Sequence, residues 1–173
     1  TMRIFLIGYM GSGKSSMGKK LASRLGYRFL DLDQIIENEQ HQSVGEIFAQ
    51  QGEESFRLFE RLALHQSFDM DDVVVSTGGG APTFFDNMAL MNKNGLSIYL
   101  KAIPAVLVNR LIPNQQLRPL IASLEKEELH DFIKAQLNER APFYDQAKLH
   151  IEARDLTPAV LHKQVQHWIE NQA

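Results

Sequence analysis

The sequence predicts an α/β domain built on a parallel β-sheet. Short apolar runs alternate with amphipathic segments along the chain of 173 residues, which is typical of strands and helices joined by right-handed crossovers. Several of the runs are almost continuously apolar, as are parallel strands that are buried on both faces. A glycine-rich loop directly follows the first run. In a sheet of this kind, ligands are expected at the carboxyl ends of the strands.

Five short runs predict the strands, in the order Arg3–Ile7, Arg28–Leu30, Val73–Ser76, Leu96–Leu100 and Leu149–Ile151. The first, third and fourth are the most continuously apolar, so we expect both of their faces to be buried. No repeat, low-complexity tract or interdomain linker interrupts the alternation. We therefore expect one domain over residues 1–173, a length that can bury a real core.

The amphipathic segments between these runs predict helices, and several have recognisable ends. Ser43–Glu46 is a capping-box pattern ahead of an apolar pair. Asn94–Gly95 is a plausible helix stop. Thr157–Pro158 places a good N-cap before a proline at the first position of the last helix.

Composition narrows the class of protein. The net charge of -3, with 44% apolar and 23% charged residues, is ordinary for a soluble domain and gives no basic field for nucleic acid. No run of about 18 apolar residues predicts a membrane span. The chain has no cysteine and no signal-peptide pattern, so we expect a cytoplasmic location. No feature demands more than a monomer.

The loop GYMGSGKS at Gly8–Ser15 lies between a predicted strand and a predicted helix, the context of a phosphate-binding loop. Its glycines let backbone N–H groups point at phosphate oxygens, and the helix N-terminus adds partial positive charge. Lys14 should reach the β- and γ-phosphates of a nucleotide, and the Ser15 hydroxyl should face Mg²⁺. The alternative is an ordinary glycine-rich turn, which would need neither the Lys-Ser pair nor the preceding strand.

Asp31 and Asp33 follow the second strand on the expected ligand side of the sheet. In an extended segment, residues two apart face the same way, so these carboxylates could serve Mg²⁺ and a substrate hydroxyl. Because no acid ends the third strand, Asp31 is the obvious second anchor for a metal. The alternative is a helix N-cap, a position that also favours acids.

Arg57 and Glu60 share one face of a predicted helix at the i, i+3 spacing. They could form a solvated ion pair worth a few tenths of a kcal/mol. Alternatively, Glu60 could orient Arg57 so that its planar fork meets a carboxylate or phosphate.

Three consecutive glycines, Gly78, Gly79 and Gly80, directly follow the third strand. Turn geometry alone explains such a run poorly. The glycines would let a ligand approach the backbone closely and would expose N–H donors to it.

Two prolines and several polar residues predict a mobile flap at residues 112–124 that carries Arg118. If Arg118 is considered alone, an ordinary surface loop explains the segment equally well. Arg140 lies near the end of the following helix, where the helix dipole also favours a surface arginine. Arg110 and Arg154 have similar alternatives as exposed charges.

Taken in order, these motifs resemble the shikimate kinases across essentially the whole chain. The resemblance implies a three-layer P-loop NTPase fold of the nucleoside-monophosphate-kinase type, with five parallel strands in the order 2-3-1-4-5. It implies a substrate-binding region at about 32–60 and a lid at about 112–124. It also implies ATP-dependent phosphorylation of the 3-hydroxyl of shikimate, in chorismate and aromatic amino acid biosynthesis.

The resemblance also implies residue roles. Asp31 and Ser15 would hold Mg²⁺, Asp33 would bind the ring hydroxyls and accept a proton, and Arg118 would close over the phosphates. The shikimate carboxylate would lie between Arg57 and Arg140, with backbone contacts from the triple glycine. The implied nucleotide-binding residues are Gly11, Ser12, Gly13, Lys14, Ser15, Ser16, Arg110, Arg118 and Arg154.

Two other functions fit parts of the sequence. A kinase of the same fold could act on another acceptor, such as gluconate or a nucleotide, but a nucleotide would not need two arginines suited to one carboxylate. A non-catalytic ATP-binding module would need only the phosphate loop, so the set of Asp33, Arg57, Arg118 and Arg140 argues against it.

Overall fold

The computed structural model describes residues 2–172, which form a five-stranded parallel sheet in the order β2-β3-β1-β4-β5. The strands are β1 (Arg3–Ile7), β2 (Arg28–Asp31), β3 (Val73–Ser76), β4 (Leu96–Lys101) and β5 (Leu149–Glu152). All five predicted strands are confirmed, and β2, β4 and β5 each extend one residue further. The predicted strand order is also confirmed.

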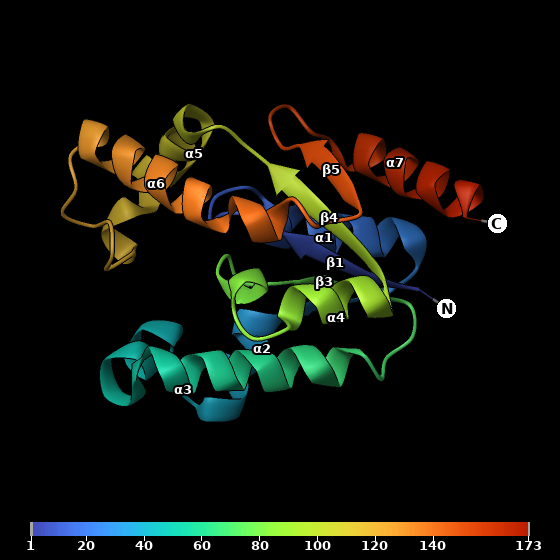
Figure 1. Cartoon of the computed structure of the whole chain (residues 1–173), viewed down its shortest axis with the longest axis horizontal. Helices are drawn as coiled ribbons and strands as arrows, with labels where there is room; N and C mark the ends of the chain where they lie inside the picture. Colours follow the sequence, from blue (N-terminus) through green and yellow to red (C-terminus); the bar gives the residue numbers. More distant parts are fainter. Residues whose placement is uncertain (1, 173) are drawn as a thin grey trace.

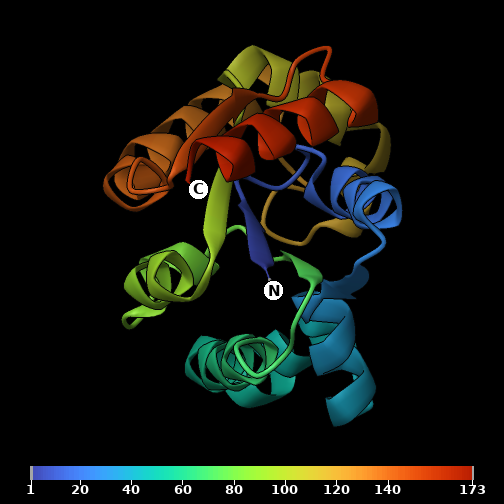
Figure 2. The ribbon, with the colours of Figure 1, turned by 90° about the vertical axis from the view of Figure 1, so that its right-hand side faces the viewer.

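Helices cover both faces of this sheet (Figures 1 and 2). They are α1 (Lys14–Leu25), α2 (Leu32–Gln40), α3 (Val44–Ser67), α4 (Asn87–Asn94), α5 (Pro104–Leu111), α6 (Lys126–Tyr144) and α7 (Pro158–Asn171), with two short 3₁₀ helices, η1 (Ala81–Thr83) and η2 (Ile112–Leu117). None of the helices within residues 2–172 is long and apolar enough to cross a membrane.

Side chains of the central strand β1 point alternately to the two faces of the sheet, and the core accordingly has two parts. Ile4 and Leu6 of β1 are completely buried in a cluster with residues of α1, α5, α6 and α7. Phe5 and Ile7 are equally buried in a second cluster with residues of α2, α3 and α4. Successive strand residues point to opposite faces, so both faces of β1 are dry, as the apolar run predicted.

The predicted helix ends are confirmed, although of the expected capping box only the Ser43 half is present among residues 2–172. The Ser43 hydroxyl accepts from the Glu46 N–H at 3.1 Å, the Thr157 hydroxyl accepts from the Val160 N–H at 3.2 Å, and α4 ends at Asn94. The sequence did not reveal a kink inside α3 at Gly52, where φ is 82°. This left-handed backbone conformation suits glycine and separates the first turns of α3 from the part that carries the site residues.

The predicted flap at residues 112–124 contains η2 followed by turns. Leu117 and Leu120 are 79% and 74% exposed, whereas Ile121 is fully buried and anchors the segment. The Gln115 side chain donates to two carbonyls of the same segment at 2.7 Å, those of Ile121 and Leu124. The segment therefore presents an apolar tip to solvent above a fixed base.

Candidate active site

The loop between β1 and α1, which the sequence predicts to bind phosphate, needs glycine at two positions. Gly11 and Gly13 have φ values of 82° and 97°, a region in which side chains with a Cβ are strained. Lys14 is the first residue of α1, and its ammonium donates to the Gly8 and Tyr9 carbonyls at 2.7 and 3.0 Å. Burial lowers the pKa of Lys14 to about 8, against the opposing effect of nearby Asp33. A polyanion bound at this loop would favour the charged form of Lys14.

A cavity of about 290 Å³ opens over this loop and brings together residues from the phosphate loop, the start of α2, the end of β3 and the flap. Its lining consists of Met10, Gly11, Gly13, Lys14, Ser15, Ser16, Asp31, Asp33, Ser76, Thr77, Gly78, Gly79 and Arg118. Ser12, a residue of this loop, is buried, and its hydroxyl has no hydrogen-bond partner among residues 2–172. Most of the predicted phosphate-binding residues therefore meet at one place.

Asp31 caps a helix and also contacts Ser15 at the end of the glycine-rich loop. Its Oδ1 accepts from the Asp33 and Gln34 N–H groups and caps α2, while its Oδ2 accepts from the Ser15 hydroxyl at 2.8 Å. The prediction of an extended Asp31–Asp33 segment was wrong, because this cap starts α2 at Leu32. Both carboxylates nevertheless line the cavity.

Asp33 has an unsatisfied acceptor inside the cavity. Its Oδ1 is buried and has no hydrogen-bond partner among the described residues. Burial and the Asp31 carboxylate raise the pKa of Asp33, and Lys14 and Arg57 only oppose this shift. An unpaired buried oxygen is costly, so the site is suited to a ligand hydroxyl.

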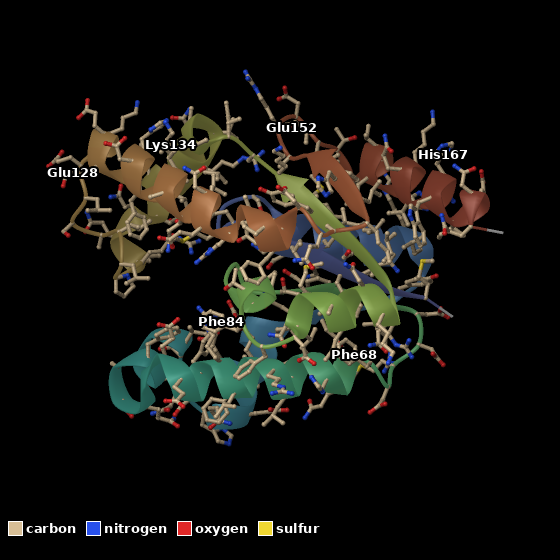
Figure 3. The ribbon with its side chains drawn as sticks, in the orientation of Figure 1. Phe68, Phe84, Glu128, Lys134, Glu152 and His167 are labelled. Carbon is tan, nitrogen blue, oxygen red and sulfur yellow. The ribbon has the colours of Figure 1, made fainter. Side chains whose placement is uncertain are left out.

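Arg57 lies between two carboxylates of α3. Its Nη1 donates to Glu60 at 2.9 Å, and Nε and Nη2 lie 3.4 Å from Glu53. The guanidinium also stacks on Phe84, 4.1 Å from the ring centroid, in the region between α3 and the η1 turn (Figure 3). Glu60 is completely buried, and burial raises its pKa to about 7. The pair is therefore not the solvated one that the spacing alone allowed.

Because Gly78, Gly79 and Gly80 have no side chains, charged groups of other residues can lie close to their backbone. A Cβ on Gly78 would lie 2.8 Å from Glu60 Oε2, and one on Gly79 would lie 3.1 Å from Arg140 Nη1. A Cβ on Gly80 would lie 2.6 Å from Arg57 Nη2. The sequence predicted that these glycines leave room for a ligand; in the structure they leave room for the groups that would hold one.

Arg140 reaches the same place from α6. Its guanidinium lies over the Tyr9 ring, 5.2 Å from the centroid, and its Nη1 is 3.4 Å from the Tyr144 hydroxyl. Tyr144 donates to the Gly79 carbonyl at 2.5 Å. Sequence reasoning gave no role to Tyr9 or Tyr144, since their site contacts arise only in the folded chain.

The other three arginines that the sequence predicted for the site, Arg118, Arg110 and Arg154, lie at different places. Arg118 lines the cavity, with Nη1 3.6 Å from the Met10 sulfur. Arg110 lies at a neighbouring cavity and donates to carbonyls of Ser12 and Ala153 at 3.1 and 3.0 Å. The Arg154 side chain is 67% exposed and lines neither of these two cavities, although its neighbour Ala153 lines the second one.

Comparisons with known proteins identify the family. The shikimate kinase family model matches residues 10–170. A shikimate kinase of Bacteroides fragilis is 51% identical over 146 residues, which cover 84% of this chain and 82% of the relative. The chain belongs to the shikimate kinase family.

Solved structures of family members agree with this fold. The crystal structure of shikimate kinase from Bacteroides thetaiotaomicron has a TM-score of 0.91 and 44% identity, with 98% of each chain covered. Shikimate kinase from Acinetobacter baumannii, solved in complex with shikimate, has a TM-score of 0.88 and 30% identity over 99% of this chain and 94% of that one.

The oxygen atoms beside the phosphate loop of this shikimate kinase family member fit Mg²⁺. Ser15 Oγ lies 2.8 Å from Asp31 Oδ2 and 3.3 Å from Ser76 Oγ. Residues 2–172 contain no cluster of three His, Cys, Asp or Glu side chains that would make a full protein cage. Mg²⁺ does not need one, because it commonly keeps water and substrate phosphates as ligands beside one or two protein groups.

Proposed function

We propose that this chain transfers the γ-phosphate of ATP to the 3-hydroxyl of shikimate, giving shikimate 3-phosphate and ADP, in chorismate and aromatic amino acid biosynthesis. One observation carries the proposal: Lys14, Asp33, Arg57 and Arg140 converge on the triple glycine from four different elements. This arrangement supports a phosphate-binding loop beside groups suited to an anionic acceptor that also carries hydroxyls.

The phosphate loop and its surroundings would hold the nucleotide. The loop amides and Lys14 would bind its phosphates, and Ser15 and Asp31 would hold Mg²⁺, directly or through water. Bound Mg²⁺ would neutralise charge on the transferred phosphate. Arg110 would border adenine from the neighbouring cavity, and Arg154 would contribute there only after its exposed side chain turns inward.

The acceptor would be fixed at both ends. Arg57 and Arg140 would bind the ring carboxylate, with the N–H groups of the glycine loop, and Asp33 would accept a hydrogen bond from the attacking hydroxyl. The hydroxyl oxygen bonds to the γ-phosphorus as the bond to the β,γ-bridging oxygen breaks, and the hydroxyl proton passes to Asp33. Phosphoryl transfer depends on such alignment and charge neutralisation more than on covalent catalysis.

Arg118 would complete the site from the flap. It lines the cavity already, and its charge would oppose that of the transferred phosphate. An arginine in this role can raise the rate by about 10³–10⁵. Closure of the exposed tip over both substrates would exclude water as a competing acceptor. The lid and substrate-binding regions, the monomeric state and the cytoplasmic location stay sequence-based predictions.

Product formation tests the proposal. Protein, Mg²⁺-ATP and shikimate are mixed, and ³¹P NMR follows the appearance of shikimate 3-phosphate. Parallel reactions contain gluconate or nucleoside monophosphates as acceptors. We expect turnover with shikimate alone; faster turnover with another acceptor, or ATP binding with no transfer to any acceptor, would overturn the assignment.

A further inference from the structure

Tyr144 is a buried polar residue that the proposed reaction leaves without a role. It is the last residue of α6, it is completely buried, and its ring packs on Tyr99 of β4 with a centroid distance of 4.9 Å. A core position of this kind is filled equally well by phenylalanine, which has no hydroxyl to satisfy. The presence of a hydroxyl group in this core therefore calls for a reason.

The hydroxyl contacts the site at two points. It donates to the Gly79 carbonyl at 2.5 Å and lies 3.4 Å from Nη1 of Arg140. Burial raises the pKa of Tyr144 above its usual value of 10.0, so the hydroxyl keeps its proton near neutral pH and can act as the donor to Gly79. One atom thus joins the backbone of the glycine loop to a guanidinium on α6.

The bond to Gly79 has a consequence for the next peptide group. A trans peptide is planar, and its C=O and N–H point in opposite directions. Fixing the Gly79 carbonyl toward Tyr144 therefore fixes the Gly80 N–H away from it. Consecutive glycines have wide backbone freedom, so without such a restraint this peptide could adopt other orientations.

Arg140 has a second tyrosine neighbour, Tyr9. The Arg140 guanidinium lies over the Tyr9 ring, and the Tyr9 hydroxyl donates to Gln136 of α6. The Gly79 backbone leaves no room for a side chain beneath Nη1. Arg140 is thus restrained by Tyr9, Tyr144 and the glycine loop together.

We infer that Tyr144 is a positioning residue that locks the Gly79–Gly80 peptide and the Arg140 guanidinium into one arrangement for the carboxylate of the acceptor. This inference rests on the proposed function and assigns the hydroxyl a part in substrate selection. The Tyr144 hydroxyl should therefore affect binding of the acceptor carboxylate and leave nucleotide binding unchanged.

Tyr144→Phe removes the hydroxyl and keeps the ring. We expect the KM for shikimate to rise about tenfold, the loss of roughly one hydrogen bond, while the KM for ATP changes less than about twofold. Tyr99→Phe is the matched control, because it removes a hydroxyl from the ring that packs on Tyr144 but leaves the contacts to Gly79 and Arg140 in place. Thermal melts of both variants separate binding from folding.

A neutral substrate analogue sharpens the test. Isothermal titration compares shikimate with its methyl ester, which keeps the ring hydroxyls but has no charged carboxylate. We expect Tyr144→Phe to weaken binding of shikimate and to leave binding of the ester unchanged. Equal losses for both ligands, or a shikimate KM equal to that of wild type, would overturn the positioning role. A wild-type protein that does not phosphorylate shikimate would instead overturn the proposed function.

Discussion

Glu60 holds Arg57 at 2.9 Å while being itself completely removed from solvent. A buried carboxylate is stable only when it is paired or protonated, and this contact pairs Glu60 Oε1, while Oε2 is buried with no hydrogen-bond partner among residues 2–172. The stack on Phe84 and the close approach to Gly80 restrain Arg57 from the other sides. The Arg57 guanidinium is thereby restrained on several sides.

Removing the Arg57 side chain should affect the binding of the two substrates differently. Arg57→Ala is expected to weaken shikimate binding by about 2–5 kcal/mol, the usual loss when one partner of a buried charge pair is truncated, with little change for ATP. Isothermal titration with each ligand measures both effects. Arg61→Ala is the control, because Arg61 lies on the same helix but stacks on Phe85 with its side chain 39% exposed. Equal shikimate affinities of wild type and Arg57→Ala would refute the carboxylate role.

A methyl group at Gly80 should act on the same binding step from the opposite side. The added Cβ of Gly80→Ala would lie 2.6 and 2.9 Å from the two terminal nitrogens of Arg57, the mobile end of a long side chain. The guanidinium should shift, so we expect a near-normal melting temperature with shikimate binding at least about tenfold weaker. Gly45→Ala is the control, since the nearest atom to its Cβ is Ser43 Oγ at 3.9 Å. Normal shikimate binding by Gly80→Ala would contradict this packing.

Glu60 should make stability depend on pH. Its folded-state pKa of about 7 exceeds the unfolded value of 4.5, so between these values only the folded chain holds the proton, and stability falls as pH rises. Gln at this position mimics the protonated acid. We expect Glu60→Gln to gain stability relative to wild type between pH 5 and pH 8, by about 3 kcal/mol at most.

Urea unfolding of the unliganded proteins at several pH values measures this difference. The control is Glu53→Gln, which alters the other carboxylate beside Arg57, one that is 57% exposed. A Glu60→Gln difference that is constant from pH 5 to pH 8 would be evidence against a buried, titrating Glu60.

Lys14 should link ATP binding to proton uptake. Its pKa of about 8 in the free protein is below the usual 10.5, so part of the population is neutral above pH 8, whereas bound phosphates favour the charged form. Wild-type ATP affinity is therefore expected to fall as pH rises above 8, with net proton uptake in titrations made in buffers of different ionisation enthalpy.

Lys14→Met should abolish this uptake and the phosphoryl transfer while the protein remains folded. Lys20→Met changes an exposed lysine of the same helix and should keep both properties. Normal turnover by Lys14→Met would remove the phosphate loop from the mechanism.

The sequence predicted the sheet and the position of the glycine-rich loop between β1 and α1 well, because both depend on local patterns. Apolar runs locate the strands, and the loop carries its glycines and Lys-Ser pair within eight residues. The order of the strands came from the family resemblance. The extended Asp31–Asp33 segment was mispredicted because Asp31 caps α2, so the helix already begins at Leu32.

The contacts that shape the candidate site could not be predicted, because they join distant parts of the chain. The spacing of Arg57 and Glu60 is the same for a solvated pair and a buried one, and burial follows from packing elsewhere in the fold. Tyr144 meets Gly79 across 65 residues of sequence. Such contacts leave no local pattern, although their residues lay inside the motifs that identified the family.

A crystal structure with shikimate and ADP bound tests the arrangement of the site most directly. We expect the ring carboxylate between Arg57 and Arg140, and the 3-hydroxyl within hydrogen-bond distance of Asp33, facing the phosphate loop. Shikimate bound away from Arg57 and Asp33, in a crystal that contains ADP at the loop, would contradict the account.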